Sequence, residues 1–155
     1  MKVKWKELIV SIAISLGIGA LSGYLTMNSM SLYNDLAKPP LTPPGWIFPI
    51  VWTILFVLMG ISAYLIYISD SKERVQALQI YAIQLMLNFL WSLVFFNMQA
   101  YLLAFVILIL LWISIFAMIK MFYDINPIAG KLQVPYLLWV TFAGYLNLAI
   151  YFLNR

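Results

Sequence analysis

The amino-acid sequence predicts an all-α membrane protein, a bundle of five transmembrane helices. Hydrophobic residues make up 65% of the 155 residues and charged residues only 9%, against roughly 25% charged in an ordinary soluble domain. The apolar residues come in several runs near or above the roughly 18–20 residues with which a helix crosses the hydrocarbon core of a bilayer. The few charges lie at the ends of these runs, so they mark where each helix leaves the membrane.

The five predicted spans form a single domain over residues 1–155. They cover residues 7–27, 46–68, 75–96, 100–122 and 134–153. Polar or helix-breaking segments separate them, because such residues end an apolar helical pattern. The segment Asp70–Arg74 follows the second span, Asn97–Gln99 makes a tight turn after the third, and a connection containing Asn126 and Pro127 follows the fourth.

The first span opens after Lys2, Lys4 and Lys6. A positive start followed by an apolar stretch also describes a cleavable signal peptide, but the stretch is longer than the roughly 7–15 residues of a signal sequence, which favours a retained helix. Small residues recur at every fourth position of this span, at Ser11, Ser15, Gly19 and Gly23. Such a row allows another helix to approach closely, although chance scatter of Gly and Ser would look the same.

The longest connection, residues 28–45, contains four prolines within Lys38–Gly45. Proline lacks the donor N–H and fixes φ, so this segment can form neither a helix nor a strand. We expect a rigid, ordered lid over one end of the bundle.

The charges also predict an orientation. Five spans put the N-terminus and the second and fourth connections on one side. That side carries Lys2, Lys4, Lys6, Lys72, Arg74, Lys120 and Lys131, and the other carries only Lys38 and Arg155. Because basic residues concentrate on the cytoplasmic side, we expect an integral protein of a bacterial cell membrane with a cytoplasmic N-terminus and an external C-terminus.

Conventional catalytic and metal-binding groups are scarce. The sequence has no Cys and no His, which removes disulfides, thiolate nucleophiles, imidazole bases and Cys/His metal sites. The acidic residues all fall at or beyond span ends, at Glu7, Asp35, Asp70, Glu73 and Asp124. Ion-coupled transport normally needs an ionisable group at membrane depth. The net charge of +4 is scattered, which argues against nucleic-acid binding.

Amide and indole side chains at helical spacing are the remaining candidates. One stripe of the third span carries Gln84, Asn88, Trp91 and Phe95; the second span carries Trp52, Phe56 and Met59, and the fifth carries Trp139, Ala143, Asn147 and Ile150. An amide in hydrocarbon needs a partner, so these stripes should face the bundle interior. We predict an aromatic pocket for a flat apolar ligand near Trp52 and Trp139. The alternatives are that the Trp52 and Trp139 indoles only pack in the core and that Asn88 only makes a hydrogen bond between helices.

At these positions the sequence resembles the tryptophan-rich sensory protein family, also called the translocator protein, peripheral-type benzodiazepine receptor or TspO/MBR family. The matching segments are Tyr33-x-x-Leu36-x-Lys38-Pro39 with Pro43-Pro44-x-Trp46-x-Phe48-x-x-Val51-Trp52 and Met59-Gly60; Gln84-x-x-x-Asn88-x-x-Trp91-x-x-x-Phe95-Phe96; and Pro135-Tyr136-Leu137-x-Trp139-x-x-Phe142-Ala143-x-Tyr145-Leu146-Asn147 with Leu153-Asn154. They cover the long connection and three of the five spans.

The resemblance implies a five-helix bundle whose first connection caps a site for porphyrins such as protoporphyrin IX, and in some relatives for sterols and synthetic benzodiazepine-type ligands. Carried over by motif position, the site comprises Tyr33, Trp52, Asn88, Trp139 and Ala143. No cofactor is implied. Some relatives are reported to degrade protoporphyrin with light and oxygen through tryptophans that match Trp52 and Trp139, so a photochemical role for these two follows as an expectation.

Two departures from the family pattern bear on this reading. Phe56 stands where members often have Tyr, and Gln79 and Ile83 replace a small-residue row that some relatives use to dimerise. A homodimer remains an expectation, with the row on the first span as another surface. The competing functional interpretations are a passive porphyrin or sterol transporter and a non-catalytic structural or regulatory membrane subunit.

Overall fold

The computed structural model describes residues 2–155 and folds this part of the chain entirely into helices and their connections. The elements are α1 (Trp5–Thr26), η1 (Met27–Ser29), α2 (Met30–Asn34), α3 (Ile47–Tyr67), α4 (Arg74–Ser92), η2 (Leu93–Asn97), α5 (Tyr101–Ile125), α6 (Pro127–Leu132) and α7 (Val134–Leu153). Within residues 2–155, five helical segments are long and apolar enough to cross a membrane. The predicted all-α bundle of five spans is therefore confirmed.

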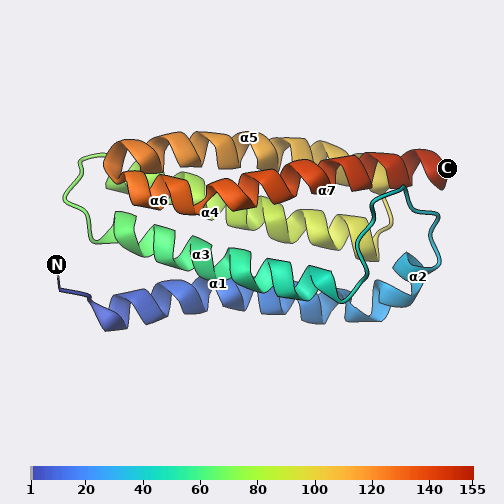
Figure 1. The fold of residues 1–155 in the computed structure, drawn as a ribbon, viewed down its shortest axis with the longest axis horizontal. Helices are drawn as coiled ribbons and strands as arrows, with labels where there is room; N and C mark the ends of the chain where they lie inside the picture. Colours follow the sequence, from blue (N-terminus) through green and yellow to red (C-terminus); the bar gives the residue numbers. More distant parts are fainter. Residues whose placement is uncertain (1) are drawn as a thin grey trace.

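The long helices run side by side along one axis, as Figure 1 shows. Helix α1 packs along α3, and α5 packs along both α4 and α7. The N-terminus and the α3–α4 connection lie at one end of the bundle, and the C-terminus and the α2–α3 connection lie at the other. The basic residues predicted to share one side of the membrane thus come from segments at one end of the fold.

The first connection is shorter than residues 28–45. Helical structure continues from α1 through η1 and α2 to Asn34, which leaves residues 35–46 as the non-helical part. The segment 28–34 is polar but contains neither Pro nor Gly, so nothing in it breaks the helix. The Pro-rich segment Lys38–Gly45 is free of helix and strand, as predicted.

The predicted connection between the fourth and fifth spans also contains a helix, α6. Its start has two helix-initiating features: the Asn126 side chain accepts a hydrogen bond from the backbone N–H of Ile128 at 3.0 Å, and Pro127 occupies the first helical position. Asn is a favoured N-cap, and Pro at the first position loses no hydrogen bond. These polar and Pro residues therefore start a helix where we had expected only a loop.

The small-residue row of α1 is used within the chain. The hydroxyl of Ser11 donates to the Gly60 carbonyl and that of Ser15 donates to the Phe56 carbonyl, each at 2.6 Å. A Cβ on Gly60 would lie 2.5 Å from the Cα of Ile12, so the two backbones touch. The helix that approaches the small-residue row closely is α3, and it covers that face of α1 as far as Gly19. The suggestion that the row from Ser11 to Gly19 offers a dimer surface is therefore wrong.

Candidate ligand-binding cavity

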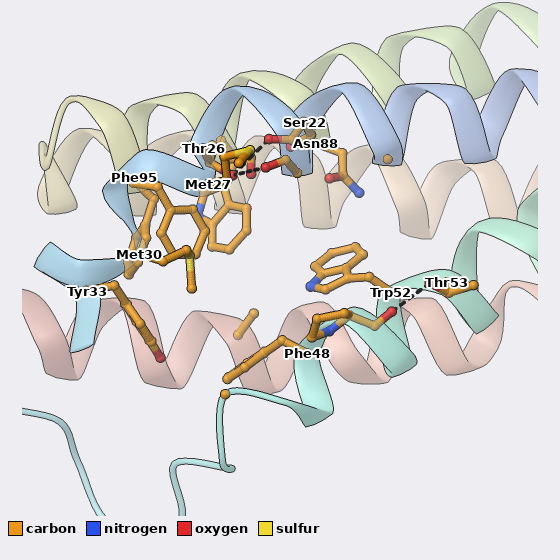
Figure 2. A pocket seen from close by; sticks show the side chains of 18 of the residues that line it. Ser22, Thr26, Met27, Met30, Tyr33, Phe48, Trp52, Thr53, Asn88 and Phe95 are labelled. Atoms are coloured by element: carbon orange, nitrogen blue, oxygen red, sulfur yellow. Dashed lines mark hydrogen bonds between the residues drawn. The ribbon is translucent and has the colours of Figure 1, made fainter.

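A cavity of about 510 Å³ lies between α1, α2, α3, α4, η2 and α7, in the half of the bundle that holds the C-terminus. Its volume falls within the roughly 300–1,000 Å³ of typical small-molecule sites. The wall consists of Leu16, Gly19, Ala20, Ser22, Gly23, Thr26, Met27, Met30, Tyr33, Gly45, Phe48, Pro49, Trp52, Thr53, Phe56, Asn88, Trp91, Ser92, Phe95, Phe96, Trp139, Ala143, Leu146, Asn147 and Ile150. Figure 2 shows Tyr33, Trp52 and Asn88 around the same space, each from a different helix.

A hydrogen-bonded chain joins α4 to α7 behind one wall of the cavity. The Asn88 side-chain amide donates to the Tyr136 hydroxyl at 2.7 Å, and that hydroxyl donates to Oε1 of Gln84 at 2.7 Å. All three residues are buried, and an unpaired polar group at this depth costs several kcal/mol. Asn88 also lines the cavity, so it serves as an interhelical hydrogen-bond donor and as part of the wall at once.

A second chain of hydrogen bonds joins three helices. The indole N–H of Trp91 on α4 donates to Oδ1 of Asn147 on α7 at 2.9 Å, and Nδ2 of Asn147 donates to the backbone carbonyl of Tyr101 on α5 at 2.8 Å. Trp91 and Asn147 both line the cavity. The same side chains therefore hold the helices together and form the ligand-facing surface.

The two predicted indoles lie in an aromatic wall. The Trp52 ring centroid is 5.7 Å from that of Phe56, 6.4 Å from Trp91 and 6.3 Å from Tyr136. The Trp139 ring meets Phe48 edge-on at 5.8 Å. Among residues 2–155, neither the Trp52 nor the Trp139 indole N–H donates a hydrogen bond to the protein. These two N–H groups are unused by the fold, unlike that of Trp91.

Tyr33 closes the end of the cavity nearest the membrane surface. It is buried and packs against Phe48, Phe95 and Phe96, with ring centroids 6.4, 6.2 and 5.5 Å away. Lys38 lies over the same ring, its Nζ 5.0 Å from the centroid, and donates to the backbone carbonyls of Asn34 and Leu36. The cap at this end is thus largely built from α2 and aromatic side chains.

The Pro-rich connection is pinned along α7. Asn154 accepts from the Ala37 N–H at 3.0 Å and donates to the Ala37 carbonyl at 2.8 Å, and the Tyr145 hydroxyl donates to the Pro40 carbonyl at 2.9 Å. From residues 35–46, however, only Gly45 lines the cavity. The connection is ordered, as expected of a lid, but it contributes little of the inner surface.

The structure brings all five predicted site residues, Tyr33, Trp52, Asn88, Trp139 and Ala143, to the wall of this one cavity. Residues not named as ligand contacts from the sequence also line it, among them Phe48, Trp91, Asn147, Ser22 and Thr26. Trp91 and Asn147 lie on the same helical stripes as Asn88 and Trp139, so the spacing carried a signal for them. Phe48 lies four residues before Trp52 and belongs to the same motif, so the sequence carried a signal for it as well. For Ser22 and Thr26 it carried no comparable signal.

The cavity is uncharged. Within residues 2–155 no Asp, Glu, Lys or Arg belongs to its wall. The Thr26 hydroxyl is bonded within its own helix, since it donates to the Ser22 carbonyl at 2.8 Å. Burying a charge there would be costly. The arrangement suits a flat, mostly apolar molecule that stacks on indole and phenyl faces and meets a few amide groups.

Comparison with known proteins identifies relatives over nearly the whole chain. The sequence model described as the TspO/MBR family matches residues 11–153. A tryptophan-rich protein TspO of Chlorobaculum tepidum is 42% identical over 150 residues, 95% of each chain. The tryptophan-rich sensory protein of Cereibacter sphaeroides is 35% identical over 154 residues, 99% of this chain and 95% of the relative.

The similarity extends to animals. A translocator protein of Homo sapiens is 31% identical over 144 residues, which cover 91% of this chain and 85% of the relative. The family membership agrees with the five-span helical fold, and the range that the family model matches, residues 11–153, includes all the residues that wall the cavity. The chain is an integral membrane protein that belongs to the TspO/MBR family.

Proposed function

We propose that the cavity binds a planar tetrapyrrole, with protoporphyrin IX as the expected ligand, and that the protein acts as a membrane-embedded sensor or translocator-type binding protein for it. The observation that carries this proposal is an uncharged cavity walled by the indoles of Trp52, Trp91 and Trp139. Three large flat aromatic surfaces around one space match a large flat aromatic ligand. The names of the relatives, tryptophan-rich sensory protein and translocator protein, agree with a ligand-handling role.

The amides give the cavity a place to orient such a ligand. Asn88 and Asn147 are held by hydrogen bonds to Tyr136 and Trp91, so their positions are set before a ligand arrives, which lowers the cost of binding. The same features suit synthetic ligands of the benzodiazepine type, which are also flat and aromatic. Protoporphyrin IX is in this proposal a ligand, and no resident cofactor is invoked.

Light-dependent degradation of the porphyrin is a second candidate function. It is favoured by the two indole N–H groups, of Trp52 and Trp139, that the fold leaves without a hydrogen-bond acceptor in residues 2–155. An electron-rich indole beside an excited porphyrin is placed to donate an electron, while the photochemistry itself belongs to the pigment.

We also propose that the end of the bundle carrying the N-terminus faces the cytoplasm of a bacterial cell. The basic residues of the N-terminus and of the α3–α4 connection support this orientation. Reporter fusions after Lys72 should read as cytoplasmic, and fusions within the α2–α3 connection near Lys38 should read as external. The reverse pattern would invert the topology without changing the site.

Replacing Asn88 by Leu tests whether this amide contacts the ligand. We expect roughly two- to tenfold weaker binding of protoporphyrin IX in darkness, since one buried hydrogen bond contributes about 0.5–1.5 kcal/mol. Absorbance titration of the purified protein in detergent measures the affinity, and thermal unfolding measures the effect on the fold.

Gln84→Leu is the matched control for that experiment. Gln84 belongs to the same Tyr136 hydrogen-bonded chain but does not line the cavity. It should therefore lower stability while leaving affinity close to that of the wild type. If both variants lose affinity equally, Asn88 acts only through the fold.

Trp52→Phe and Trp139→Phe separate binding from photochemistry. Phe keeps a flat apolar ring but is much harder to oxidise, and neither substitution removes a hydrogen bond that the fold uses. Dark affinity should stay within about tenfold, roughly 1.4 kcal/mol. If the indoles donate electrons, loss of porphyrin absorbance under light should slow markedly in one or both variants.

Trp5→Phe, at the opposite end of α1 and exposed, controls for the loss of any indole. Bleaching at the wild-type rate in both cavity variants would reject the degradation reading and leave the binding proposal standing. Wild-type protein that neither binds protoporphyrin saturably nor alters its bleaching would reject both.

A further inference from the structure

Helices α1 and α3 are in contact along one half of their length and separate along the other. The backbones touch where Gly60 meets Ile12, and a Cβ on Gly19 would lie 2.6 Å from the Phe56 ring. One turn further along α1, a Cβ on Gly23 would meet nothing within 4 Å. The α3 residues at this level are Thr53 and Pro49, one and two turns before Phe56. The contact therefore ends between Gly19 and Gly23.

The cavity reaches the outer surface of the bundle where the two helices separate. Within residues 2–155, six residues both line the cavity and are exposed. Met27 and Gly45 are two of these, and Gly45 belongs to the α2–α3 connection. The other four border the gap between the two helices: Ala20 and Gly23 on α1, and Pro49 and Thr53 on α3. In Figure 2, α1 (blue) runs along one side of the cavity and α3 (green) along the other. We call this opening, bounded by these four residues, the α1–α3 window.

The window faces the hydrocarbon of the membrane rather than water. Its neighbours on the outer surface are large apolar side chains, Leu21 on α1 and Ile50 and Ile54 on α3, each about half exposed. Thr53 lies six residues after the start of α3 at Ile47, which is roughly 9 Å along a helix. That depth lies inside a hydrocarbon core about 30 Å thick.

Among the four residues that bound the window, Thr53 has the one polar side chain, and its hydroxyl is bonded within its own helix. The Thr53 hydroxyl donates to the Pro49 carbonyl at 2.7 Å, and the Thr26 hydroxyl donates to the Ser22 carbonyl at 2.8 Å. Figure 2 draws both bonds as dashed lines. Because these hydroxyls are turned back to their own helices, an apolar molecule crossing the window displaces no hydrogen bond.

The end of the cavity beside α2 is packed with aromatic side chains around Tyr33. Tyr33 is buried in its contacts with Phe48, Phe95 and Phe96. The connection beyond it is fastened to α7 by both hydrogen bonds between Ala37 and Asn154. A ligand entering past Tyr33 would have to break this packing, whereas one entering through the window would not.

We propose that the α1–α3 window is the route by which a flat, membrane-dissolved ligand reaches the cavity from the outer half of the bilayer. This inference rests on the proposed tetrapyrrole-binding function and adds the route to it. Small residues at Ala20 and Gly23 keep the window wide enough for a planar ring system. The window makes the bilayer, into which the apolar macrocycle of a porphyrin partitions, the source of the ligand; the carboxyl groups of the propionate chains would remain at the mouth of the cavity rather than in its uncharged interior.

Gly23→Leu tests the route, and Gly17→Leu is its matched control. Both glycines are exposed on α1 with open space around them, but only Gly23 borders the cavity. Protein in lipid vesicles is mixed in darkness with vesicles loaded with protoporphyrin IX, and tryptophan quenching follows association. We expect association and dissociation both to slow about tenfold in Gly23→Leu, which is the kinetic signature of a narrowed route. Gly17→Leu should associate at the wild-type rate.

A second test compares the labelled and unlabelled forms of the same folded variant. The sequence has no Cys, so Thr53→Cys carries a unique thiol at the window, and Ile54→Cys places one on the neighbouring lipid-facing position. A bulky maleimide on residue 53 should slow association, and the same label on residue 54 should not. Unchanged association in both Gly23→Leu and labelled Thr53→Cys would overturn the route while binding itself persists. A wild-type protein that does not bind protoporphyrin saturably would overturn the proposed function as well.

Discussion

The hydrogen-bonded chain from Asn88 through Tyr136 to Gln84 is the constraint on which the rest of the structure depends. Buried polar side chains at membrane depth need partners within the protein. These three bond to one another, while the Gln84 amide nitrogen has no partner among residues 2–155. These bonds set the rotation of α4 and α7 about their axes. Once these rotations are set, Trp91 meets Asn147, and Trp139 and Ala143 face the same space as Asn88. The requirement that stabilises the bundle therefore also orients the residues that wall the cavity.

Helices α1 and α3 complete the cavity by a different interaction. Contact between their backbones at Gly60 and Ile12 is possible only because Gly has no side chain, and two serine hydroxyls of α1 bond to α3 carbonyls beside it. This contact closes one half of the helix pair and ends near Gly19. The other half stays apart, so Trp52 on α3 faces the cavity rather than α1. Tight packing at one end thus determines where the cavity lies and where it opens.

Much of this could be predicted from the sequence because helical periodicity is local. The amide and indole stripes on three spans required only the 3.6-residue repeat and the cost of burying an amide, and the structure places Asn88, Trp52 and Trp139 around one cavity. Three features were missed or misjudged: the helical extension to Asn34, the short helix α6, and the helix that packs on the small-residue row of α1. Each depends on an interaction with another element or on a cap, which spacing alone does not reveal. The separation of α1 from α3 after Gly19 depends on how the two helices pack against each other, and no local pattern encodes it.

The claim that the cavity is the ligand site is tested most directly by filling it. Ala143 lines the cavity and is buried on α7, so Ala143→Phe puts a phenyl ring into the space a porphyrin would occupy. Ala13→Phe, on the exposed face of α1, adds the same ring away from the cavity. The measurement is the stoichiometry and affinity of protoporphyrin IX binding in darkness, with unfolding temperature measured in parallel. The account predicts that Ala143→Phe loses saturable binding while it remains folded and that Ala13→Phe binds like the wild type. Undiminished binding by a folded Ala143→Phe protein would contradict it.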